Sequence, residues 1–150
     1  MKLRHLVAIL VIALVMPSFA FSMGEKANEE EQGSAYDMGK KAADSKDWTK
    51  AVGLFQKAVS ANPKDHRAHN MLGYSLRHVG KYKEAISAYN AALTLKPDYA
   101  EALEYRGGAY LKAGNLAAAM KDYQTLVKMG SPLAKELKEE IDKAGKASGS

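Results

Sequence analysis

Four side chains with binding chemistry recur at intervals of three, four and three residues in one short stretch. They are Arg67, Asn70, Tyr74 and Arg77. Residues at this spacing lie on one face of an α-helix. An arginine can donate paired hydrogen bonds to a carboxylate, an asparagine can bond a peptide backbone, and a tyrosine adds contact area at low entropic cost. The stripe predicts a surface that binds polypeptide, although a solvated helix face explains any single one of these residues equally well.

The histidines offer a second chemistry, but too few of them converge for a metal site. His66 and His69 lie one helical turn apart, and the chain has no cysteine. Catalytic zinc takes three protein ligands, so two imidazoles fall short. Helix packing explains His69, a turn position explains His66, and His78 is expected to be a cation at a helix C-terminus. No metal or cofactor is expected.

Catalytic motifs are missing from the sequence. It has no Gly-x-Ser-x-Gly, no His-Glu-x-x-His and no phosphate loop, and without cysteine it has no thiol nucleophile and no disulfide. The acidic run Glu29–Glu31 is typical of solvated chain. The sequence therefore predicts a protein that is not an enzyme.

The first twenty residues form a segment of their own. Lys2 and Arg4 precede an apolar run over residues 6–16, and small residues lead up to Ala20. This pattern is typical of a secretory signal peptide, and the run is too short for a ~30 Å hydrocarbon core. We expect cleavage near Ala20 and an exported, periplasmic protein; a retained N-terminal anchor, and with it membrane contact, is the alternative. Losing these two cations lowers the formal net charge from +5 to +3, which gives no reason to expect nucleic acid as a partner.

The strongest pattern is a repeat with a period of 34 residues, which is typical of stacked repeat arrays. Five columns keep this period: Gly39, Gly73 and Gly107; Ala51, Ala85 and Ala119; Phe55, Tyr89 and Tyr123; Trp48, Tyr82 and Leu116; and Pro63 with Pro97.

These columns resemble the tetratricopeptide repeat, whose pattern is Trp-x2-Leu-Gly-x2-Tyr, then Ala-x3-Phe, then Pro. The middle unit carries Leu72-Gly73 and then Ala85-x3-Tyr89. The resemblance covers about 32–132 and implies an all-α fold, an α-solenoid of three helix-turn-helix repeats. We place the repeats at 32–65, 66–99 and 100–131, a capping helix at 132–145, and flexible segments at 21–31 and 146–150.

The columns also predict how a unit packs. Gly73 and Ala85 allow its two helices to approach closely, and the ring of Tyr89 fills the space toward the next unit. Gly80 is placed in the turn, where a positive φ is readily accepted. Asp98 is expected to cap the helix that follows it.

Membership of this family would make the first helices of the units line a concave face that binds extended peptides or partner helices. The stripe of the middle unit lies on that face. The same face of the other units carries Tyr36, Lys40 and Asp44 in the first, and Glu101, Glu104, Tyr105, Gly108 and Lys112 in the third.

One ligand known in the family, the C-terminal carboxylate of a chaperone, is not expected here. The positions that would hold it are occupied by Tyr36, Lys40, Met71, Glu101 and Tyr105. Most of the required lysine, asparagine and arginine side chains are absent, and Glu101 places a negative charge where a cation is needed.

These observations predict a non-enzymatic interaction module in the bacterial envelope. It would serve as an adaptor, scaffold or assembly factor, with an unidentified protein or peptide in the groove. The alternative is a structural scaffold that self-associates by stacking the end faces of its arrays.

Overall fold

The computed structural model describes residues 34–148, and within this range it contains seven α-helices and no strand. The predicted signal peptide and the segment 21–31 lie outside the described residues. The helices are α2 (Ala35–Asp44), α3 (Trp48–Ala61), α4 (His66–His78), α5 (Tyr82–Leu95), α6 (Ala100–Lys112), α7 (Leu116–Lys128) and α8 (Leu133–Ser148).

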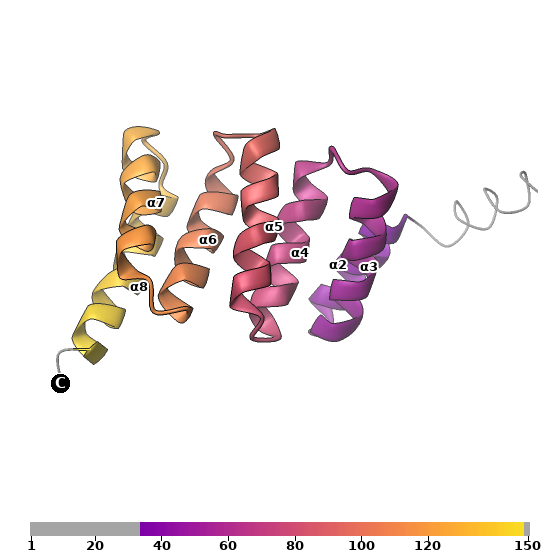
Figure 1. The fold of residues 1–150 in the computed structure, drawn as a ribbon, viewed down its shortest axis with the longest axis horizontal. Helices are drawn as coiled ribbons and strands as arrows, with labels where there is room; N and C mark the ends of the chain where they lie inside the picture. Colours follow the sequence, from indigo (N-terminus) through magenta and orange to yellow (C-terminus); the bar gives the residue numbers. More distant parts are fainter. Residues whose placement is uncertain (1–33, 149–150) are drawn as a thin grey trace, which may run out of the picture. The chain divides into compact units, whose positions relative to one another are not determined.

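The helices follow one another side by side as three antiparallel hairpins, α2/α3, α4/α5 and α6/α7 (Figure 1). Each hairpin packs against the next, the first helices α2, α4 and α6 are neighbours, and α8 packs against both α6 and α7. The predicted all-α repeat fold is confirmed.

Helix α8 extends beyond the predicted end of the capping helix at residue 145. It continues to Ser148, so residues 146–148 belong to the helix and not to a flexible tail. Lys146 and Ala147 favour helix, and Gly145 costs only about 1 kcal/mol relative to alanine, which is too little to end a helix that is packed at its other end.

The turn inside each hairpin uses one residue in the left-handed region. Gly80 has a φ of 80° and Gly114 a φ of 77°, as the sequence predicts for Gly80. The first hairpin places Lys46 at the equivalent position with a φ of 59°. A side chain there costs about 1–2 kcal/mol, so the first turn carries strain that the others avoid.

Asp98 does not cap the helix that follows it. The residue at the N-cap of α6 is Tyr99, which makes no side-chain capping bond, and Asp98 pairs with Lys96 at 3.3 Å. In the preceding hairpin the carboxylate of Asp65 accepts a hydrogen bond from the backbone N–H of Arg67 at 2.9 Å. Asp65 is equivalent to Tyr99, so Asp98 stands one residue too early for this role.

Close approach of the helices depends on glycine. A Cβ atom added to Gly73 would lie 2.7 Å from the ring of Tyr89, and one added to Gly39 would lie 2.8 Å from the ring of Phe55. In the third hairpin the atoms nearest to Gly107 belong to Leu137 of α8. The rings of Phe55 and Tyr89 are fully buried, so these contacts form the centre of the first two hairpins.

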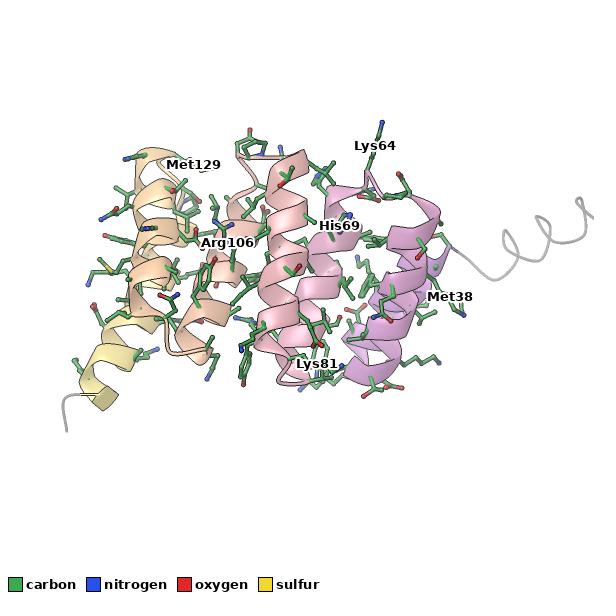
Figure 2. All side chains as sticks on the ribbon, viewed as in Figure 1. Met38, Lys64, His69, Lys81, Arg106 and Met129 are labelled. Atoms are coloured by element: carbon green, nitrogen blue, oxygen red, sulfur yellow. The ribbon has the colours of Figure 1, made fainter. Side chains whose placement is uncertain are left out.

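An unpredicted buried ion pair joins the helices of the third hairpin. Arg106, which lies among the helices in Figure 2, donates to Asp122 from Nε at 3.0 Å and from Nη2 at 2.6 Å. Asp122 is only 3% exposed. The equivalent residues of the middle hairpin are Leu72 and Ala88, so a charged pair here takes the place of an apolar contact.

We predict opposite effects for two glycine-to-alanine substitutions. Gly73→Ala should lower the free energy of unfolding by about 1–3 kcal/mol, because the new methyl group presses on the buried ring of Tyr89. The matched control is Gly53→Ala in α3, where a Cβ meets nothing within 4 Å. It should raise the free energy of unfolding by about 1 kcal/mol through helix propensity. Urea unfolding followed by circular dichroism measures both, and equal effects would contradict the packing described.

Candidate functional site

A pocket of about 400 Å³ opens between three helices of the C-terminal half. It is formed by α4, α6 and α8, so the helix predicted as a cap also provides one wall. The lining residues are Arg77 from α4, Gly108, Leu111 and Lys112 from α6, and Glu140, Lys143 and Ala144 from α8.

Arg77 is held at this pocket by aromatic rings. Its guanidinium carbon lies 5.5 Å from the ring centroid of Tyr74 and 5.5 Å from that of Tyr105. A Cβ on Gly108 would lie 2.6 Å from Nη1 of Arg77 and 2.9 Å from Oε2 of Glu140, so glycine makes room for both charged groups. Among residues 34–148, no hydrogen bond or ion pair engages the guanidinium of Arg77, which lines the pocket.

The rings continue away from the pocket toward the first hairpin. His78 stacks on Trp48 with centroids 3.9 Å apart and an interplanar angle of 7°, and it meets Tyr74 edge-on at 4.7 Å. Burial lowers the pKa of His78, and the nearby charge of Arg77 lowers it further. Both effects act against the cation expected at this helix end, where His78 instead stacks on Trp48.

Glu104 of α6 does not itself line this pocket, and it is almost completely buried. It is 7% exposed, and burial raises its pKa to about 7; the charge of Glu140 acts in the same direction, while Arg77 opposes the shift. Glu104 precedes Gly108 by one helical turn, so both lie on the face of α6 over which Arg77 is placed. Glu104, a buried carboxyl group with a pKa raised to about 7, thus lies on the same face of α6 as Gly108 and within the electrostatic influence of Arg77.

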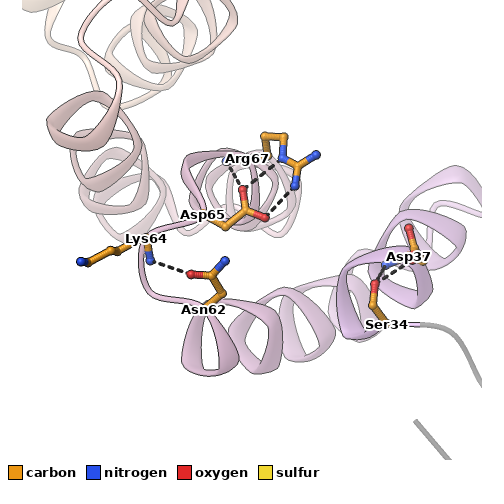
Figure 3. A network of polar contacts seen from close by, with 6 residues as sticks. All are labelled: Ser34, Asp37, Asn62, Lys64, Asp65 and Arg67. Atoms are coloured by element: carbon orange, nitrogen blue, oxygen red, sulfur yellow. Dashed lines mark hydrogen bonds and ion pairs between the residues drawn. The ribbon is translucent and has the colours of Figure 1, made fainter. Parts of the chain in front are cut away.

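Arg67 and Tyr36 lie at a second pocket, of about 350 Å³, near the start of the described chain. Arg67 donates to the carboxylate of Asp65 from Nε and from Nη2, both at 3.1 Å (Figure 3). Its guanidinium carbon also lies 5.4 Å from the ring centroid of Tyr36. Hydrogen bonding from Arg67 lowers the pKa of Asp65. Arg67 is exposed, but its donors are already shared with Asp65.

Asn70 does not project into the groove as predicted. It is 3% exposed, and its Nδ2 donates to the hydroxyl of Tyr99 at 3.4 Å. Because α4 lies between α2 and α6, the middle of its face is covered by a neighbour. Asn70 therefore contributes to packing between units and cannot reach a ligand in this conformation.

The structure divides the ten predicted residues into groups. Arg77 and Lys112 line the larger pocket, and Tyr74 and Tyr105 contact Arg77 without lining it. Tyr36 and Arg67 line the smaller pocket, and Asn70 is buried between neighbouring units. The three that remain, Lys40, Asp44 and Glu101, are exposed and line neither pocket.

Sequence reasoning missed the contribution of α8, which places Glu140 and Lys143 at the larger pocket. The available signal concerned Glu140 alone, which follows the buried Leu137 by three residues and so lies on the flank of the apolar stripe of α8. Trp48 was also missed, because its column was interpreted only as packing.

The part of the chain that the structure describes offers no group of three metal-binding side chains. Nε2 of His69 instead lies 2.9 Å from the carbonyl oxygen of Pro63. None of the described helices has the length and apolar character needed to cross a membrane.

Known proteins resemble this chain in sequence. The family described as "Tetratricopeptide repeat" matches residues 36–100 and 79–134. The peroxisomal targeting signal receptor of Saccharomyces cerevisiae is 41% identical over 56 residues, which is 37% of this chain and 9% of the receptor. The STIP1 homolog of Dictyostelium discoideum is 28% identical over 121 residues, which is 80% of this chain and 20% of that protein. The chain thus spans a small part of the length of both relatives.

Solved structures show the same fold. One, described as "First TPR of Spaghetti (RPAP3) bound to HSP90 peptide SRMEEVD", matches with a TM-score of 0.68 and 23% sequence identity. The match covers 77% of this chain and 91% of that one.

We predict that Glu104 makes stability depend on pH. Its pKa is raised from 4.5 to about 7 in the folded protein, so the folded form binds the proton more tightly than the unfolded form. The free energy of unfolding should therefore fall as pH rises between these two values, and stay low above about pH 7. Glu104→Gln should abolish most of this slope.

The measurement is urea unfolding at about pH 5 and about pH 8. Glu101→Gln removes an exposed carboxylate from the same helix, and this control should keep the slope of the unchanged protein. If the free energy of unfolding of Glu104→Gln depends on pH as strongly as that of the unchanged protein, Glu104 does not cause the pH dependence.

Proposed function

Because the chain belongs to the tetratricopeptide repeat family, we propose that it is a protein-interaction module. It binds an extended segment of another protein along the face formed by α2, α4, α6 and α8. The observation that carries this proposal is the larger pocket. There, the guanidinium of Arg77 makes no hydrogen bond or ion pair within residues 34–148, and it contacts the rings of two half-buried tyrosines, Tyr74 and Tyr105. Aromatic and arginine side chains of this kind are typical anchors of protein interfaces.

The solved structure of Spaghetti (RPAP3) is described with a bound HSP90 peptide, which supports peptide binding by this fold. We propose a different ligand for this chain, because the positions predicted for a chaperone tail lack the necessary cations. Among them, Glu101 is an exposed acid on α6, and Tyr105 packs against Arg77. The ligand should instead engage Arg77 and the rings beside it.

We also propose that the protein is exported and acts in the bacterial envelope as an adaptor, scaffold or assembly factor. This proposal is supported by the sequence alone, through Lys2, Arg4 and the apolar run over residues 6–16. It predicts that protein recovered from the periplasm has an intact mass that begins at Phe21. A mass that includes residues 1–20, recovered with the membrane, would contradict cleavage.

Photocrosslinking in cells tests the groove. A photoreactive amino acid at Lys112, an exposed residue of the larger pocket, should form an adduct with one partner protein. Arg77→Glu in the same protein should abolish the adduct while the helical circular dichroism stays unchanged. The reason is that charge reversal removes the anchor without emptying the core.

The control for this experiment is the same photoreactive residue at Gln124, an exposed position of α7 that lines neither pocket. It should not capture the partner. Capture of the same partner at Gln124, or an adduct at Lys112 that survives Arg77→Glu, would reject this face as the binding site.

A further inference from the structure

Three cations from three different helices line the larger pocket: Arg77 of α4, Lys112 of α6 and Lys143 of α8. One carboxylate, that of Glu140, stands among them. Arg77 is the cation with the most fixed position, since Tyr74 and Tyr105 both contact its guanidinium. An arginine fixed in this way, whose guanidinium makes no hydrogen bond or ion pair with the described residues, is prepared for a planar anion that takes two parallel hydrogen bonds.

We propose that this pocket is an anion subsite that binds a carboxylate side chain of the peptide in the groove, and that buried Glu104 opens and closes the subsite by gaining and losing a proton. The inference rests on the proposed function and adds to it the charge of the ligand and a means of control. Aspartate or glutamate is the occupant to which the site is fitted, because its carboxylate matches the fork of Arg77 and one such side chain fits a pocket of about 400 Å³.

The control follows from the position of Glu104, which is buried one helical turn before Gly108, the residue over which the guanidinium of Arg77 lies. When Glu104 is charged, its carboxylate partly neutralises the positive charge of Arg77 and repels an incoming carboxylate. A protonated Glu104 leaves the positive charge of Arg77 to the ligand. The ionisable groups that act on Glu104 or are acted on by it come from every helix around it: Arg77 of α4, Tyr89 of α5, Tyr105 of α6, and Glu136 and Glu140 of α8.

Two carboxylates of α8 therefore reinforce the switch. Burial raises the pKa of Glu104 most, and the charges of Glu140 and Glu136 act in the same direction. A carboxylate bound in the pocket adds one more negative charge and favours protonation further. By linkage, protonation of Glu104 must strengthen ligand binding by the same factor. Affinity for an acidic ligand should thus rise as pH falls from about 8 to about 6.

The test uses peptides selected from a random dodecapeptide display library on the full chain at about pH 6. Each selected peptide is synthesised in two forms that differ in one side chain, Glu or its neutral isostere Gln. Titration calorimetry then gives the affinity of both forms. We expect the Glu form to bind about tenfold more tightly, and this advantage to vanish in Arg77→Gln. Lys143→Gln should reduce it partly, and serves as the readout if Arg77→Gln does not fold.

The pH arm compares the same Glu peptide at about pH 6 and about pH 8. The unchanged protein should lose about fivefold to tenfold in affinity at the higher pH. Glu104→Gln should bind at the higher pH as tightly as the unchanged protein binds at the lower one. The matched control Glu101→Gln, an exposed carboxylate of the same helix, should keep the full pH dependence.

The outcomes separate this inference from the proposed function. Peptides that bind the groove equally well in the Glu and Gln forms overturn the anion subsite and leave the proposed function standing. Tighter binding of a phosphoserine form than of the Glu form overturns the assignment of the subsite to a carboxylate and also leaves the proposed function standing. A pH dependence that persists in Glu104→Gln overturns the switch. If no peptide binds, the proposed function fails and the inference fails with it.

Discussion

The contact between a glycine and an aromatic ring sets the geometry of the whole repeat. Tyr89 lies directly on Gly73, and Phe55 on Gly39, at distances that leave no room for a methyl group. This contact fixes how closely the two helices of a hairpin approach, and the hairpin in turn fixes how far α4 lies from α6. The pocket around Arg77 needs that spacing, because its lining comes from three separate helices. Packing in the core and recognition at the surface therefore share one constraint.

The fold was predictable because its determinants are local and repeated. Each unit carries its own small residues, its own ring and its own turn, so three copies of one weak pattern make a strong one. Helix ends followed from residues such as Gly80, whose φ is positive as expected. Asp98 failed as a cap because Tyr99 stands at the equivalent of Asp65. The repeat therefore predicts which positions pack together, but equivalent positions can carry side chains of different chemistry.

The site was only partly predictable, since burial and charge depend on which unit lies next to which. Helical spacing placed Tyr74 and Arg77 on one face, but the same rule placed Asn70 there, and a neighbouring helix covers it. The raised pKa of Glu104 arises first from its burial between neighbouring helices and then from the charge of Glu140 on α8, more than thirty residues away in sequence. A stripe on a single helix cannot reveal such a neighbour. The Arg106–Asp122 pair was missed for the same reason, because neither residue predicts a buried ion pair until the structure brings the two together.

Helix α8 both packs against the third hairpin, through Leu137, and forms one wall of the larger pocket. The side chain of Leu137 presses on Gly107, as the aromatic rings press on the equivalent glycines, while Glu140 and Lys143 follow on the same helix at the pocket wall. Proteolytic trimming between α7 and α8 would consequently uncover the end of the array and dismantle the binding pocket in one event. A product without α8 would lack one wall of the pocket and also the side chain of Leu137 that covers Gly107. It would therefore be neither a stable protein nor a competitor for the partner.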